Sequence, residues 1–349
     1  MSILGIILIL LAGFSQGTFG LGMKHQKPLS WAHFWLIYTF FGMLIIPILW
    51  GVFSTSAFWP ILLATPHEVI FKAIGLGFLW GIGGILFGKS VEYVGISITN
   101  GVVMGLAGGL GAIIPLMGIP GVSSSPSFIW VIVGVAMMLV GVGFSAYAGI
   151  IRDKESHLSS PPSDTTARVS GIASQGSTIG LLIVILAGVL SSLLNVGFEA
   201  ANPMVKIATD MGVSTSAAGL PARAIVVFGG FLMNAGYALY ILLTSKNNQV
   251  STDTISEPQA TVKANLWAIF TGLLWFLPLG LSGIVAARIG VLGNTITWPV
   301  MLSLSLVFGN VWGYMTDEWK GAQKAFMWMI ASSVILIVSC LILTFKDLL

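Results

Sequence analysis

Long, continuously apolar segments dominate this sequence and limit what it can fold into. A transmembrane helix needs about 20 apolar residues to cross a hydrocarbon layer about 30 Å thick. The segments lack the two-residue alternation that barrel strands show. Ten of them are long enough, at residues 3–21, 32–53, 68–87, 94–116, 128–151, 179–198, 217–243, 266–287, 291–315 and 325–345. We therefore expect an all-α membrane protein with ten transmembrane helices.

The composition agrees with this interpretation and narrows the possible partners. Hydrophobic residues make up 56% of the 349 residues and charged residues only 8%, whereas soluble domains carry about 25% charged residues. The single cysteine, Cys340, excludes an internal disulfide and argues against a metal cluster. The net charge of +3 comes without a basic run or a nucleic-acid motif. We expect membrane lipid as a partner, and no nucleic acid, metal or cofactor.

Two polar stretches interrupt the apolar segments and suggest how the chain is organised. Residues 152–177 and 245–263 are rich in Ser, Thr and charged residues, as flexible linkers are. The first of them separates five predicted spans from five. We therefore predict a first five-helix repeat at residues 1–151, a polar linker at 152–177 and a second five-helix repeat at 178–349.

Internal similarity supports this division. The stretch "GIILILLAG" at residues 5–13 resembles "GLLIVILAG" at residues 180–188, and Leu79–Trp80 matches Leu274–Trp275. Because each half has an odd number of spans, the second half enters the membrane in the opposite orientation. Inverted repeats are a structural basis for alternating access, with the substrate site near the midplane between the halves.

The distribution of Lys and Arg between the loops predicts the orientation, because cytoplasmic loops carry an excess of these residues. One side receives ten of them, namely Lys24, Lys27, Lys89, Arg152, Lys154, Arg168, Lys246, Lys263, Lys320 and Lys324. The other side receives five, namely Lys72, Lys206, Arg223, Arg288 and Lys346. We therefore expect a multi-pass membrane protein with both termini on the outer side.

One carboxylate lies where lipid would penalise it, in the stretch "NVGFEAANPMVK" at residues 195–206. A charge at the bilayer centre costs about 2.5–3.5 kcal/mol on insertion scales. If the helix continues through this stretch, bent at Pro203, it carries one polar stripe. The spacing of four, three and four residues places on that stripe Asn195, Glu199, Asn202 and Lys206.

Two interpretations of Glu199 follow from this stripe. In the first, the carboxylate faces a cavity or a neighbouring helix and accepts protons, while Lys206 tunes its proton affinity. In the second, Glu199 and Lys206 form an interfacial salt bridge that caps a helix end.

Further polar and aromatic side chains in the spans are candidates for contact with a polyhydroxylated ligand. Amides and arginine offer donors and acceptors, and an indole face can stack on a sugar ring. The candidate substrate-binding residues are Gln16, Trp80, Asn195, Asn202, Arg223, Asn234, Trp275, Asn294 and Trp298. The polar ones could instead bridge helices. Tryptophans often serve as interfacial anchors, which we expect of Trp31, Trp35, Trp50 and Trp59.

Several stretches together resemble one transporter family over nearly the whole chain. They include "FLWGIGGILFGKSVEYVGIS", "AANPM" and "GLPARAIVVFGGFLMNAGY". With these, the chain resembles the L-rhamnose–proton symporter family of the drug/metabolite transporter superfamily. The resemblance implies ten helices in two inverted halves, and uptake of L-rhamnose driven by protons across a bacterial inner (plasma) membrane. Matching positions are Trp80, Gly81, Gly83, Pro203, Gly230 and Asn234.

The sequence also departs from the family pattern at charged positions. Ala32 stands where the resemblance implies an acidic residue, Glu199 where it implies an asparagine, and Glu92 where it implies a basic residue. These differences leave the sugar and the coupling ion open.

These observations favour a secondary transporter that takes up L-rhamnose or a related sugar by proton symport with alternating access. The alternative is an exporter of amino acids or other small metabolites. An enzyme is not expected, because all four histidines fall in loops or at span ends, namely His25, His33, His67 and His157. The oligomeric state is left open.

Overall fold

The computed structural model describes residues 3–158, 177–244, 258–317 and 319–345. Most of the predicted linker lies at 159–176, outside the described residues. The first half contains α1 (Ile3–Met23), α2 (Trp31–Thr39), the π-helix η1 (Phe40–Ile45), α3 (Ile46–Ser54), α4 (Phe58–Ala64), α5 (His67–Val94), α6 (Ile96–Met117), the 3₁₀-helix η2 (Val122–Ser124) and α7 (Pro126–Leu158). The second contains α9 (Ser177–Ala200), α10 (Asn202–Asp210), α11 (Thr215–Ala218), α12 (Leu220–Thr244), α14 (Pro258–Ile289), α15 (Gly293–Met315) and α16 (Gln323–Phe345).

Ten helical segments of the described chain are long and apolar enough to cross a membrane. Each corresponds to one of the predicted spans, and no strand occurs in the part of the chain that is described. The prediction of an all-α membrane protein with ten transmembrane helices is therefore confirmed. The sixth span is longer than expected, because α10 extends it from about residue 198 to Asp210.

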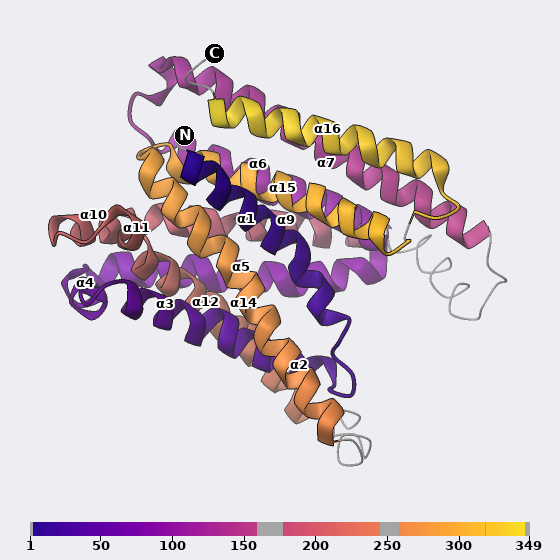
Figure 1. Ribbon diagram of the computed structural model, residues 1–349, viewed down its shortest axis with the longest axis horizontal. Helices are drawn as coiled ribbons and strands as arrows, with labels where there is room; N and C mark the ends of the chain where they lie inside the picture. Colours follow the sequence, from indigo (N-terminus) through magenta and orange to yellow (C-terminus); the bar gives the residue numbers. More distant parts are fainter. Residues whose placement is uncertain (1–2, 159–176, 245–257, 318, 346–349) are drawn as a thin grey trace.

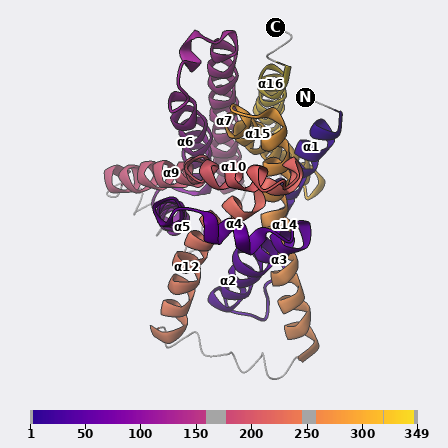
Figure 2. The ribbon, with the colours of Figure 1, turned by 90° about the vertical axis from the view of Figure 1, so that its left-hand side faces the viewer.

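The helices form two splayed groups around a central layer (Figure 1). Helices α7 and α16 lie side by side at one edge, and α2, α12 and α14 lie at the other, with α9 and α10 crossing between them (Figure 2). Two hydrogen bonds join α16 to α7. Ser332 Oγ donates to the Gly141 carbonyl at 2.8 Å, and Ser339 Oγ donates to the Gly134 carbonyl at 2.7 Å.

The outward faces of the helices are apolar. Leu182 on α9, Phe71 on α5 and Val334 on α16 expose more than half of their surface. Apolar side chains on such faces are compatible with lipid tails, whereas a water-soluble protein rarely exposes large contiguous apolar patches. The protein is therefore a multi-pass membrane protein.

Glycines allow the helices of the core to approach closely. A Cβ at Gly77 of α5 would overlap the Val226 carbonyl of α12, and one at Gly272 of α14 would lie 2.8 Å from the backbone of Gly42. These two glycines are 195 residues apart, the same offset as between Trp80 and Trp275.

The glycines that end the two similar stretches, at residues 5–13 and 180–188, also occupy corresponding positions. Gly13 of α1 packs against Leu304 of α15, and Gly188 of α9, 175 residues later, packs against Leu106 of α6. Corresponding residues thus make corresponding contacts, which supports the predicted repeat. The inverted relation of the halves stays a prediction.

Replacing Gly77 with Ala tests this packing. The added methyl group has no room between α5 and α12, so the helices must separate. We expect a loss of about 1–3 kcal/mol in the free energy of unfolding, as for other overpacked cores. Thermal unfolding in detergent measures it.

Gly84, on the same helix, supplies the matched control. A Cβ there meets no atom within 4 Å, so Gly84→Ala should change stability by less than about 0.5 kcal/mol. Equal effects of the two substitutions would contradict the packing argument.

Candidate functional site

The sixth span breaks next to Glu199. Helix α9 ends at Ala200 and α10 begins at Asn202, while Ala201 between them adopts φ −88° and ψ 4°. Pro203 lies in the first turn of α10, where its missing N–H group costs no helical hydrogen bond. The predicted continuation of the sixth span past Glu199 is therefore confirmed, but the helix is interrupted at Ala201 rather than bent at Pro203, and the polar stripe is divided between α9 and α10.

Glu199 is half-buried and accepts two amide hydrogen bonds. Asn202 Nδ2 donates to Oε1 at 2.5 Å, and Asn294 Nδ2, on α15, donates to Oε2 at 3.0 Å. Lys206 is exposed on α10, and no ion pair joins it to Glu199 in the described structure. The structure thus brings Glu199 and Asn202 together but separates Lys206 from both. The predicted salt bridge does not form, and Lys206 stays exposed on α10.

Arg223 supplies the positive charge that the sequence led us to expect from Lys206. Its side chain, on α12, is only 4% exposed. Nε donates to the Leu279 carbonyl at 2.8 Å, and Nη2 donates to Asn294 Oδ1 at 3.1 Å. The guanidinium lies 4.7 Å from the ring centre of Phe198, within cation–π range. A Cβ at Gly283 would overlap the guanidinium, so α14 leaves space for it.

Asn294 connects the two charges. Its amide group donates to Glu199 and accepts from Arg223, so one side chain bridges a carboxylate and a guanidinium. The backbone carbonyl of Asn294 also accepts from Asn195 Nδ2 at 3.2 Å, and the same nitrogen donates to the Gly111 carbonyl at 2.6 Å. A buried charge is tolerated only when it is paired and hydrogen-bonded. We call Asn195, Glu199, Asn202, Arg223 and Asn294 the charged network.

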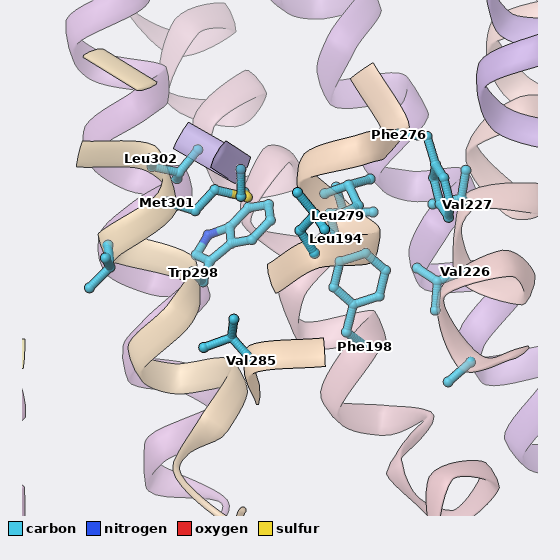
Figure 3. Packing of buried hydrophobic residues seen from close by; sticks show 14 of the residues in the cluster. Leu194, Phe198, Val226, Val227, Phe276, Leu279, Val285, Trp298, Met301 and Leu302 are labelled. Atoms are coloured by element: carbon cyan, nitrogen blue, oxygen red, sulfur yellow. The ribbon is translucent and has the colours of Figure 1, made fainter. Parts of the chain in front are cut away.

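Apolar residues surround the charged network. Figure 3 shows Phe198, Leu279 and Trp298 in this packing, and all three belong to the main buried cluster. Trp298 is 6% exposed, and its Nε1 donates to the Ala107 carbonyl of α6 at 2.9 Å. Its ring meets Phe198 edge-on at 6.4 Å. Trp298 therefore lies beside the network without bonding to it.

A second group of side chains lies farther along α12. Trp80 of α5 and Trp275 of α14 stack with ring centres 5.5 Å apart. Tyr38 of α2 contacts Trp275 edge-on at 6.2 Å and Trp35 at 5.0 Å. Trp35 Nε1 donates to Asn234 Oδ1 at 3.2 Å. We call these five residues the aromatic group, and both halves of the chain contribute to it.

The structure separates two residues that we expected on one face. Arg223 belongs to the charged network and Asn234 to the aromatic group, and eleven residues of α12 place them about 16 Å apart along the helix axis. Gln16 is half-buried on α1, and no described partner hydrogen-bonds to its side chain. Seven of the nine candidate substrate residues therefore divide between the two regions, and Gln16 and Trp298 lie outside both.

Two members of the aromatic group were missed by the sequence analysis. We expected Trp35 to be an interfacial anchor, but it hydrogen-bonds to buried Asn234, and Tyr38 was not considered. The spacing of these aromatic residues could have predicted that they lie together. Trp31, Trp35 and Tyr38 lie four and three residues apart, so they share one helix face, and Trp31 stacks on Trp35 at 5.0 Å.

Comparison with known proteins decides the family. A family model described as L-rhamnose-proton symport protein matches residues 1–346. The chain belongs to this symporter family. L-rhamnose-proton symporters of Yersinia pestis (strain Pestoides F) and of Yersinia pseudotuberculosis serotype O:1b (strain IP 31758) are 26% identical over 333 residues, covering 92% of this chain and 91% of theirs. No solved structure matches.

Membership in the L-rhamnose–proton symport family makes the protein a transporter and not an enzyme. It confirms the resemblance inferred from the "WGIGG" and "AANPM" stretches. The match over residues 1–346 includes both the charged network and the aromatic group. The family match itself gives no role to either group.

Replacing Asn294 with Leu tests the bridge between the charges. The substitution leaves Arg223 and Glu199 each with one buried hydrogen bond fewer. We expect the free energy of unfolding to fall by about 1–3 kcal/mol, the usual cost of a buried polar group left unsatisfied. Thermal unfolding in detergent provides the measurement.

Asn265→Leu on α14 is the control, because the half-buried side-chain carbonyl of Asn265 already lacks a hydrogen-bond partner. It should unfold close to the wild-type temperature. If Asn294→Leu were as stable as this control, the stabilising role of the Asn294 bridge would be contradicted.

Proposed function

We propose that the protein takes up L-rhamnose or a related sugar by proton symport with alternating access. The observation that carries the proposal is the half-buried carboxylate of Glu199, held across the α9–α10 break and joined through Asn294 to buried Arg223. A titratable group in a membrane span is a functional candidate when its partners come from several helices. Family membership supports the choice of sugar and proton.

Glu199 is the proton site in this proposal. The ionised carboxylate accepts from two amides and offsets the charge of Arg223. A protonated carboxyl group carries no charge, and one oxygen becomes a donor. The protonated oxygen is a weaker acceptor for the amide N–H group that bonds to it, so either the Asn294 bond between α9 and α15 or the Asn202 bond weakens. Proton binding therefore changes how the helix break is held.

The aromatic group is the sugar site in this proposal. It combines indole faces with the buried amide of Asn234, which suits a ring that has apolar faces and hydroxyl edges. Trp80 and Trp275 stack directly on each other, so a sugar must separate them to bind between them. The group draws residues from α2, α5, α12 and α14, and movement of one half against the other changes its width.

Coupling then connects the two groups. If proton binding favours the arrangement that binds sugar, sugar binding favours protonation by the same factor. The corresponding packing of α1 on α15 and of α9 on α6 supports two five-helix repeats, at residues 1–151 and 178–349, that exchange two asymmetric arrangements. We assign both termini to the outer side of a bacterial inner membrane on the distribution of Lys and Arg.

Replacing Glu199 with Gln tests the proton site. The neutral amide keeps the size of the side chain but cannot exchange a proton. We expect L-rhamnose accumulation driven by an imposed pH gradient to be abolished, while exchange of labelled for unlabelled sugar persists. Flux into proteoliposomes measures both processes.

Lys206→Gln is the control, because Lys206 lies outside the charged network; it should accumulate sugar normally. Normal accumulation by Glu199→Gln would remove Glu199 from proton coupling. Amino acids tested in the same wild-type proteoliposomes distinguish the alternative: their efflux, without uptake of L-rhamnose, would point to a metabolite exporter.

Replacing Trp35 with Phe tests the sugar site. The substitution keeps an aromatic ring but removes the hydrogen bond that orients Asn234. A hydrogen bond contributes about 0.5–1.5 kcal/mol, so the KM for L-rhamnose should rise about two- to twelvefold. Initial rates of uptake give the KM.

The matched substitution is Trp50→Phe. Trp50 packs against Phe276 at 5.8 Å and against Gly280, away from the amide of Asn234. Its KM should stay near the wild-type value. An unchanged KM in Trp35→Phe would separate the aromatic group from sugar binding.

A further inference from the structure

A polar cavity of about 250 Å³ lies apart from both groups, between α6, α7 and α15. It is at the membrane side where α6 begins and where α7 and α15 end. The residues that matter for the argument are Asn100, Ser145, Arg152, Ser305, Asn310 and Trp319. None of them was a predicted site residue.

Helices α6 and α15 pack along each other, and we call the space between them the α6–α15 crevice. The Trp298 indole fills one end of it, and the cavity lies at the other end. The stretch "SITNG" at residues 97–101 of α6 resembles "TITWP" at residues 295–299 of α15, and the packed residues Leu106 and Leu304 have the same spacing of 198 residues. In this alignment Asn100 corresponds to Trp298.

Trp298 closes its end of the crevice. Its indole nitrogen donates to the Ala107 carbonyl, and a Cβ at Gly111 would lie 2.6 Å from that nitrogen. The residues that correspond to Ala107 and Gly111 are Ser305 and Gly309, and both line the cavity. The cavity is therefore the counterpart of the space that the Trp298 indole fills, left open because Asn100 is smaller.

The chemistry of the lining indicates what the cavity binds. The buried Trp319 Nε1 has no hydrogen-bond partner in the described structure. Arg152 lies 5.2 Å from the Trp319 ring centre and pairs with Asp153 at 3.2 Å, so its charge is already compensated. Neutral amides and hydroxyls supply the remaining polar groups. Such a lining suits an uncharged, polyhydroxylated ligand better than an anion.

We propose that this cavity is a second sugar-binding site, at the membrane side where α6 begins and where α7 and α15 end. This inference rests on the proposed transport of L-rhamnose. A sugar in this cavity would lie among the amides of Asn100 and Asn310 and the hydroxyls of Ser145 and Ser305.

Cysteine protection tests the inference, and the chain suits it because Cys340 is its single cysteine. In a Cys340→Ser background, Ser145→Cys places one thiol in the cavity and Gln323→Cys places one at an exposed position on the same membrane side. L-rhamnose at ten times its Kd should slow methanethiosulfonate modification of the first about tenfold, following site occupancy. The second should react at the same rate with and without sugar.

The second site is overturned if L-rhamnose does not change the modification rate of Ser145→Cys in a protein that still accumulates the sugar. That result leaves the proposed function standing. If Ser145→Cys does not accumulate sugar, Asn100→Cys takes its place under the same criterion. Absence of L-rhamnose uptake by the wild type would instead overturn the proposed function itself.

Discussion

A buried guanidinium is the constraint on which the centre of this protein depends. Lipid offers no hydrogen-bond acceptors and no counter-charge, so Arg223 must find both within the protein. The Leu279 carbonyl and Asn294 supply the acceptors, and Glu199 supplies the negative charge through the Asn294 amide. These bonds fix α12 against α14 and α15, and they hold the end of α9 at the break before α10. The packing of four helices thus follows from satisfying one side chain.

The same arrangement underlies the proposed role of Glu199 as the proton site. A carboxylate that holds two amides from different helices cannot change its protonation without changing those contacts. The aromatic group lies about 16 Å farther along α12, and helices α12 and α14 contribute side chains to both regions. Rigid helices that have two arrangements are a physical means of coupling separate sites. In the proposed mechanism, proton and sugar therefore need no direct contact to influence each other.

The two halves of the chain repeat the same helix contacts but carry different side chains at corresponding positions. Gly13 and Gly188 make matching contacts, and so do Gly77 and Gly272. Residues elsewhere on the same helices differ: Trp298 fills a crevice that its counterpart Asn100 leaves open, and Lys24 lies 175 residues before Glu199. Similar backbone spacing with different side chains therefore lets two similar halves carry different polar features.

Hydrophobic length is a local property of the chain, and for that reason the sequence alone determined the ten spans, the membrane class and the unusual position of Glu199. It also identified Trp80 and Trp275, because a common offset relates them. Contacts between helices depend on how each helix ends, tilts and rotates, and no local pattern specifies these. Only the tertiary structure therefore decided that a turn at Ala201 separates Lys206 from Glu199 and that distant Arg223 compensates the carboxylate. It also decided that Trp35 turns from the interface to bond Asn234, because that indole N–H finds its acceptor 199 residues away on another helix.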